Sequence, residues 1–200
     1  GEPLDALREA FEHAVKYRST AASRPCAPVR DYHEMRGEFS EPLPESGADA
    51  QQVIRQLVEQ GEPGLMQMVH PRFFGWVLGA SHPAGVAADW LASAWGQNTG
   101  YHTPTPTTAA VEEVAAEWLL ELLDLPREAS VGFATGASVG NFVALAAARN
   151  HVLREHGWDS NADGLFGAPE IHVFIGDDAH TAVFSALQFL GLGHDRVIRI

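Results

Sequence analysis

The chain has 200 residues, of which 46% are apolar and 20% are charged, a balance typical of a globular protein with a buried core. Acidic residues outnumber basic ones by 26 to 13, and the formal net charge of −13 argues against partners such as nucleic acid or anionic membrane surfaces. The single cysteine, Cys26, cannot form an internal disulfide. With no apolar run of about 18 residues and an acidic N-terminus unlike a signal peptide, we expect a cytoplasmic protein.

The N-terminal third alternates between helical and irregular patterns. Apolar residues at helical spacing predict helices over residues 3–18 and 48–61, the second ending at Gly61. The proline-rich residues 23–47 between them are expected to be extended. The aromatic and glycine-rich residues 70–85 show no clean period, and helical spacing resumes over residues 86–98. Residues 1–69 are thus expected to form a helical and extended segment that precedes the main domain, residues 70–200.

Residues 107–125 give the clearest helical pattern. Apolar side chains recur on one face, while the other face carries four glutamates: Glu112, Glu113, Glu117 and Glu121. Paired carboxylates can serve metal binding or acid–base chemistry, but a solvated face explains them more simply. Pro126 is expected to end this helix.

The order of elements after residue 131 points to an α/β fold. Strand patterns at 131–135, 171–175 and 196–200 alternate with helical patterns that begin after Gly136 and after His180. Such alternation favours a mostly parallel sheet with covering helices. The pattern stops at Ile200 without a closing helix, so the domain is expected to be incomplete there.

The turn between the first strand pattern and its helix carries the clearest chemical motif. Gly136-Ala137-Ser138-Val139-Gly140 matches G-x-S-x-G, the turn that presents a nucleophilic serine in α/β-hydrolases. Two other interpretations remain open: Ser138 can be a helix N-cap, or the turn can bind an anion through its free N–H groups.

The hydrolase interpretation needs an acid and a base later in the chain. Asp177 or Asp178 and His180 or His194 follow in the required order, but Asp178 and His180 lie on one turn, and no HGGG-type oxyanion segment precedes the serine. We therefore rank this interpretation below the others.

No metal site is predicted. His151, Glu155 and His156 approach a known zinc motif, but the spacing differs by one residue. Histidines five positions apart on a helix point about 140° from each other, so they cannot share one ion.

Five segments occur together in a family-like order: "EPG" with "HPRFFGWV", "AADWLASAW", "TPTTAAVEEVAAEWLLELLDLP", "GASVGNFVALAAAR" and "DDAHTAVFSALQFLGLG". In this order the sequence resembles the N-terminal portion of the group II pyridoxal-phosphate-dependent amino-acid decarboxylases, the family that includes aromatic-L-amino-acid decarboxylase. The resemblance implies a fold of the aspartate-aminotransferase type (type I). Residues 70–200 would then be the first part of the large domain that binds pyridoxal 5'-phosphate (PLP).

The same resemblance implies roles for individual residues. Gly136, Ala137 and Ser138 correspond to the turn that holds the cofactor phosphate. His180 corresponds to the histidine that stacks on the pyridine ring and takes part in binding or protonating the substrate, which makes it the catalytic candidate. Trp76, Val77 and Leu78 fall where the family lines its substrate pocket. That pocket is shared across a homodimer, so residues 1–69 are expected to wrap a partner subunit.

The implied activity is decarboxylation of an L-amino acid to an amine and CO2, with aromatic substrates preferred. Val139 departs from the family, which usually has an acidic residue there, and Gly140-Asn141 also differs. By the resemblance, the Schiff-base lysine and the aspartate that pairs with the pyridine nitrogen are expected beyond Ile200. The only lysine, Lys16, matches neither, so these 200 residues alone are not expected to be active. Another PLP lyase of the same fold type and a non-catalytic fragment are the alternatives.

Overall fold

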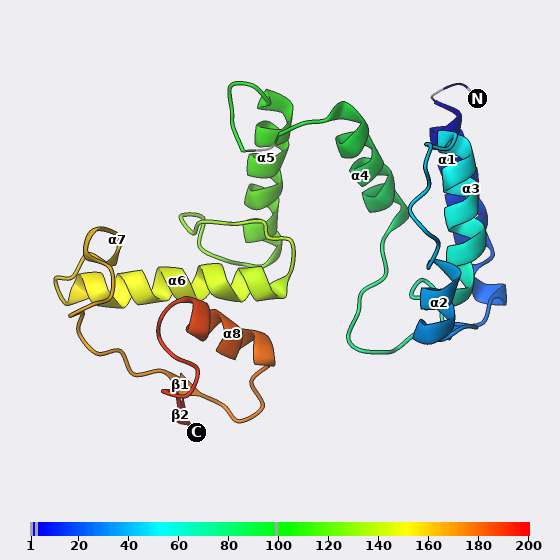
Figure 1. Cartoon of the computed structure of the whole chain (residues 1–200). Coiled ribbons are helices and arrows are strands. Elements are labelled where there is room, and N and C mark those ends of the chain that lie inside the picture. Colours follow the sequence, from blue (N-terminus) through cyan, green and yellow to red (C-terminus); the bar gives the residue numbers. More distant parts are fainter. Residues whose placement is uncertain (1, 3, 99) are drawn as a thin grey trace. The chain divides into compact units, whose positions relative to one another are not determined.

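The computed structural model describes residues 2, 4–98 and 100–200 (Figure 1). The chain divides into two compact units, Gly1–Gln97 and Asn98–Ile200. The expected boundary between residues 69 and 70 separates a segment that wraps a partner from the start of the cofactor domain. It is a different boundary from the one between the compact units, and it stays a prediction.

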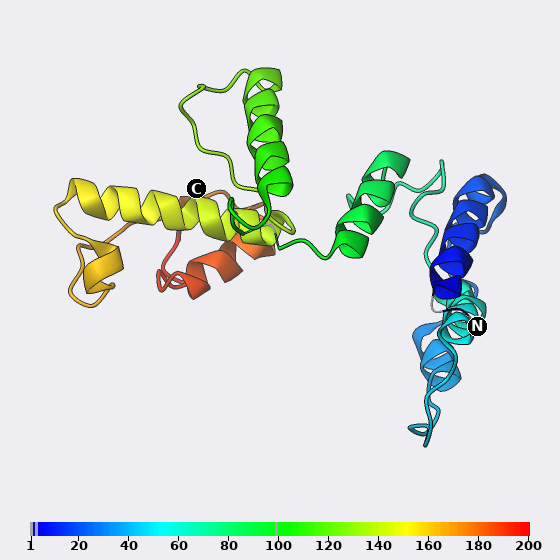
Figure 2. The ribbon, with the colours of Figure 1, turned by 90° about the horizontal axis from the view of Figure 1, so that it is seen from above.

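The first unit is built of helices. α1 (Asp5–Ser19), α3 (Ala50–Gly61) and α4 (Pro83–Trp95) confirm the helices predicted from periodicity. α1 and α3 lie side by side in both views (Figures 1 and 2), and Glu9 accepts a hydrogen bond of 2.9 Å from Arg55 across them. Two short 3₁₀ turns, η1 (Ala21–Ser23) and η2 (Glu62–Gly64), follow α1 and α3.

The proline-rich segment was expected to be extended, and this is wrong for α2 (Tyr32–Glu38). The Asp31 side chain accepts from the Glu34 N–H, and the Glu34 carboxylate accepts from the Asp31 N–H. This capping box satisfies two helix-end N–H groups. The sequence signal was present as D-x-x-E, and all the prolines of the segment lie outside α2.

The second unit contains four helices and a small parallel sheet among its described residues. The helices are α5 (Pro106–Leu122), α6 (Ala137–Glu155), α7 (Ser160–Asp163) and α8 (Thr181–Phe189). Strands β1 (Phe174–Ile175) and β2 (Ile198–Arg199) pair in parallel, with Phe174 opposite Ile198. The connection through α8 is therefore the predicted strand–helix–strand order.

The strand expected at residues 131–135 does not form in the structure, which pairs β1 only with β2. A strand exists only where its N–H and C=O groups pair with a neighbour, and no described strand lies alongside these residues. Of the mostly parallel sheet that was expected, the described residues form one short pair of parallel strands, and the second unit is mainly helical.

The interface between α6 and α8 is the best-buried part of the chain. Leu153 on α6 and Leu187 on α8 are 1% and 0% exposed, and Ala186 and Leu190 are also buried. The Arg149 guanidinium of α6 donates a 2.9 Å hydrogen bond to the carbonyl of Leu190 just after α8. This bond satisfies a C-terminal carbonyl that the helix itself leaves unpaired.

Helix α5 has the predicted position, but its apolar face is not buried. Trp118 and Leu122 are 66% and 79% exposed, and only Leu120 on this helix is buried. The glutamate face is exposed as expected.

Both units leave large apolar side chains exposed, among them Leu7 and Phe11 in the first unit and Trp118 and Phe166 in the second. Exposed apolar faces of this kind are typical of surfaces that other protein segments cover.

Candidate cofactor site

The helix that follows the G-x-S-x-G turn begins two residues earlier than an N-cap at Ser138 would require. Gly136 is the N-cap of α6 in an extended conformation, and Ser138 is already inside the first turn. No side chain caps this end. The N-cap interpretation of Ser138 is therefore wrong.

The N-terminus of α6 leaves hydrogen-bond donors available. The first N–H to find a helical acceptor is that of Gly140, which donates to Gly136 at 3.1 Å. Within the described part of the chain, nothing accepts from the N–H groups of Ala137, Ser138 or Val139. Three unpaired donors and the positive end of the helix dipole favour a bound anion.

The turn also has room for such an anion. Residues 136–139 are exposed, and no described atom lies within 4 Å of the place that a Cβ on Gly136 would occupy. A phosphate can therefore approach the backbone closely, and the Ser138 hydroxyl adds a further donor. The residues present fit the phosphate of PLP.

His180 lies at the N-terminus of α8, after the turn that follows β1. Its Nδ1 accepts a 3.1 Å hydrogen bond from the N–H of Ala182, so the histidine is the N-cap of α8. Because Nδ1 acts as an acceptor, the neutral ring carries its proton on Nε2. The imidazole is exposed and can offer both a flat face and an Nε2–H donor.

The structure brings the two candidate positions of the second unit to one end of a helix pair. α6 and α8 contact each other, and both helices begin at the same end in the two views (Figures 1 and 2). Ser138 and His180 each stand at the start of one of these helices. Ligands of α/β proteins bind at this kind of position, where helices start after strand ends.

Trp76, Val77 and Leu78 lie in the first unit, in the loop before α4. Trp76 and Val77 both have φ of 53°, in the left-handed region that side chains other than glycine rarely adopt. Val77 is fully exposed, and Trp76 is tilted against Phe73 with ring centroids 6.2 Å apart. Such backbone strain is concentrated at functional sites.

The hydrogen bonds of a serine-hydrolase triad do not occur among the described residues. The Nδ1 of His180 is occupied by a backbone N–H, Asp177 pairs with Arg199 at 3.5 Å, and His194 lies 3.3 Å from its neighbour Asp195. A triad requires the acid to orient the histidine and the histidine to contact the serine. The geometry therefore does not support Ser138 as a nucleophile.

Residues 2, 4–98 and 100–200 lack two kinds of feature. They contain no group of three or more His, Cys, Asp or Glu side chains placed to hold a metal ion. They also contain no helix that is both long and apolar enough to cross a membrane.

Comparison with known proteins gives consistent matches. The chain is 27% identical over 192 residues to the aromatic-L-amino-acid decarboxylase of Bacillus atrophaeus, covering 96% of this chain and 38% of that protein. It is 32% identical over 177 residues to a glutamate decarboxylase-like protein of Gibberella zeae, covering 86% and 32% of the two chains. The chain thus spans about two fifths or less of the length of these relatives.

Solved structures share the fold. Mouse CSAD matches 98% of this chain and 41% of its own, with a TM-score of 0.84 and 21% identity. The structure of Oryza sativa TDC with PLP and tryptamine matches 98% and 41%, with a TM-score of 0.81 and 25% identity. The family described as the pyridoxal-dependent decarboxylase conserved domain matches residues 33–199, and the chain belongs to this family.

Proposed function

We propose that this chain is the part of a PLP-dependent L-amino-acid decarboxylase that holds the cofactor's phosphate and one face of its ring. The observation that carries the proposal is the N-terminus of α6, where three N–H groups without acceptors in the described chain face an open turn. Family membership supports the phosphate of PLP as the anion that these N–H groups bind.

Each residue of the site has a distinct task. The N–H groups of Ala137 and Ser138 and the Ser138 hydroxyl donate to the phosphate, and Gly136 allows its close approach. The His180 ring packs on the face of the pyridine and presents Nε2–H toward the substrate, as donor or proton carrier. PLP, when bound, supplies the electron sink for loss of CO2 from Cα.

The substrate pocket is assigned to Trp76, Val77 and Leu78. The strained backbone at Trp76 and Val77 supports this assignment, because such strain clusters at active sites and ligand-binding loops. An apolar wall with an indole suits an aromatic amino acid, and the name of the Bacillus atrophaeus relative agrees with that choice. The name of the Gibberella zeae relative points to an acidic substrate instead, so an activity panel must decide.

The working form is a cytoplasmic homodimer. The apolar stripe of α1 supports this part of the proposal, because Leu7 and Phe11 are 65% and 54% exposed. Residues 1–69 would wrap the partner subunit, and residues 70–200 would begin the cofactor domain.

The phosphate site can be tested with pyridoxine 5'-phosphate, which lacks the aldehyde and cannot react with Lys16. Calorimetry should show binding of this phosphate ester and at least about tenfold weaker binding of pyridoxine. Ser138→Asp should abolish binding by charge repulsion, whereas Ser93→Asp, the same change on the exposed face of α4, should not. Equal binding of the two ligands would overturn the phosphate site.

Decarboxylation is tested separately, on the protein at the full length of its relatives. CO2 release from a panel of aromatic, acidic and branched amino acids should identify the substrate class. If the phosphate site binds but no amino acid releases CO2, the other PLP lyase reactions become the better assignment. Fluorophosphonate labelling of Ser138 would instead restore the hydrolase interpretation.

A further inference from the structure

The loop before α4 is tied to helix α1 at its far end. Arg18, in the last turn of α1, donates from Nη1 to the Ser81 hydroxyl at 2.9 Å and from Nη2 to the Ser81 carbonyl at 2.5 Å. Ser81 directly precedes His82, the N-cap of α4, so this contact fixes the point where the loop ends and the helix begins. A guanidinium that donates from two nitrogens to one residue holds that residue in orientation as well as in distance.

Few other contacts hold this part of the first unit. Among the described residues, no other hydrogen bond or ion pair joins residues 74–97 to the remainder of the unit. The rings of Phe11 on α1 and Trp90 on α4 meet edge to face, with centroids 6.1 Å apart. Arg18 is therefore the main polar restraint on where the loop lies.

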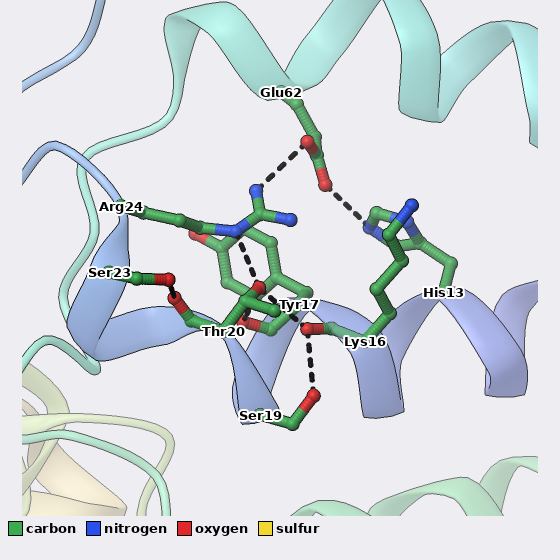
Figure 3. Close-up of polar contacts among 8 residues, drawn as sticks. All are labelled: His13, Lys16, Tyr17, Ser19, Thr20, Ser23, Arg24 and Glu62. Atoms are coloured by element: carbon green, nitrogen blue, oxygen red, sulfur yellow. Dashed lines mark hydrogen bonds and ion pairs between the residues drawn. The ribbon is translucent and has the colours of Figure 1, made fainter.

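Helix α1 is itself fixed on the side that meets η2, as Figure 3 shows. Glu62 of η2 accepts a 2.9 Å hydrogen bond from Arg24 Nη1, and its other carboxylate oxygen lies 3.3 Å from His13 Nε2 on α1. Arg24 also donates from Nε to the hydroxyl of Thr20, the C-cap residue of α1, at 2.9 Å. The C-terminal half of α1 thus holds both ends of the segment that runs from Glu62 to Ser81.

Between these two anchors lie the residues that are assigned to the substrate pocket. Trp76 and Val77 have left-handed backbones, and both side chains are exposed. Within residues 74–81, the only described backbone hydrogen bond is the one that the Leu78 N–H donates to the Gly75 carbonyl, at 3.3 Å. Because the loop makes so few bonds of its own, its position depends on the residues that hold its ends.

We propose that Arg18 is a positioning residue for the substrate: by holding Ser81, it sets where residues 76–78 meet the amino-acid side chain. This inference rests on the proposed function, since it takes residues 76–78 as the substrate pocket. A misplaced pocket wall weakens binding of the substrate and of the transition state alike, so loss of the anchor raises KM and leaves kcat nearly unchanged. All the residues involved belong to the first unit.

Steady-state kinetics of the holoenzyme at the full length of its relatives, with the amino acid that it decarboxylates best, test the proposal. Arg18→Gln removes both donors and keeps a good helix former, so it should raise KM at least about fivefold and change kcat by less than about twofold. Arg18→Lys keeps the positive charge at the end of α1 but loses the fork of donors, so it should also raise KM, at least about threefold. Arg8→Gln is the matched control, because Arg8 pairs with Asp5 within α1, and KM should not change.

A double-mutant cycle identifies the partner of Arg18. Ser81→Ala removes the hydroxyl acceptor and keeps the carbonyl, so it should raise KM by about twofold, less than Arg18→Gln does. Combined with Arg18→Gln, it should add no further increase, because both changes then remove the same contact. Additive increases would mean that Arg18 acts through another residue and would overturn the proposal.

The outcomes separate this proposal from the proposed function. An unchanged KM in Arg18→Gln would overturn it, and so would loss of kcat together with bound cofactor, because Arg18 would then support the fold as a whole. If no amino acid is decarboxylated, the proposed function fails, and chymotrypsin still decides whether Arg18 anchors the loop. Cleavage after Phe74 and Trp76, identified by mass spectrometry, should be at least about threefold faster in Arg18→Gln than in Arg8→Gln. Equal cleavage rates would overturn the anchor with or without activity.

Discussion

The helix pairs α6–α8 and α1–α3 differ in what they bury. α6 and α8 enclose Leu153 and Leu187 almost completely, and an arginine of one helix binds the C-terminal end of the other. α1 and α3 lie against each other without a single buried residue, and their best contact is the ion pair between Glu9 and Arg55. The first pair is a core, whereas the second leaves apolar side chains such as Leu7 and Phe11 exposed.

The largest expected effect separates the α6–α8 core from the exposed face of α5. Leu187→Ala removes a fully buried side chain and should lower the free energy of unfolding by about 3 kcal/mol. Leu122→Ala on the exposed face of α5 should change it by less than about 0.5 kcal/mol. Urea unfolding of the chain measures both, and similar losses would mean that α5 is as buried as α8.

The α1–α3 surface should matter for assembly rather than for folding. Leu7→Asp places a charge in the apolar stripe and should weaken a homodimer on the order of a hundredfold, measured by analytical ultracentrifugation. Leu43→Asp, on an exposed side chain of the irregular segment after α2, serves as the control. A dimer unaffected by Leu7→Asp would exclude this stripe from the interface.

In the strained loop before α4, one substitution is expected to stabilise the protein rather than destabilise it. Val77→Gly relieves a left-handed backbone and should raise the free energy of unfolding by about 1 kcal/mol. Leu78→Gly, at a neighbouring position without positive φ, should lower it by roughly 0.5 kcal/mol. Destabilisation by Val77→Gly would show that the side chain contributes more than the strain costs.

The smallest effect concerns the ion pair of α1 and α3. The hydrogen bond from Arg55 holds the pKa of the Glu9 carboxyl below its ordinary 4.5. A lowered folded-state pKa stabilises the protein above the unfolded value, and this contribution is lost as the pH falls from about 4.5 through the folded value. Glu9→Gln should therefore flatten the pH dependence of stability in acid, measured by thermal melts. If the melting temperature of Glu9→Gln fell with decreasing pH as steeply as that of the parent protein, this prediction would be wrong.

The spacing of apolar residues and the positions of glycine and proline identified the main helices, because both signals depend only on residues close together in the sequence. The residues that start α6 and end α3, Gly136 and Gly61, were visible in the sequence for this reason. Burial was not predictable in the same way, since Trp118 follows the same helical pattern as a core residue but is exposed. Whether a helix face is buried depends on segments far away in the sequence, and the periodicity within one helix does not describe these segments.

The candidate site shows the same limit. The turn with Ser138 and the position of His180 could be identified from sequence, because each precedes a helix and matches a family motif. The role of Gly136 rather than Ser138 as N-cap depends on backbone angles. The ion pair between Arg24 and Glu62 was not predicted, because it joins segments far apart in the sequence.

The Nδ1 bond of His180 has a chemical consequence beyond the shape of the helix. His82 at the start of α4 makes the same bond, to the N–H of Ala84 at 3.2 Å, so the geometry alone does not mark a reactive histidine. It does restrict what His180 can exchange: only the Nε2 proton can be transferred without releasing the start of α8. In the proposed function, any proton that His180 exchanges must therefore pass through Nε2, because Nδ1 accepts from the Ala182 N–H.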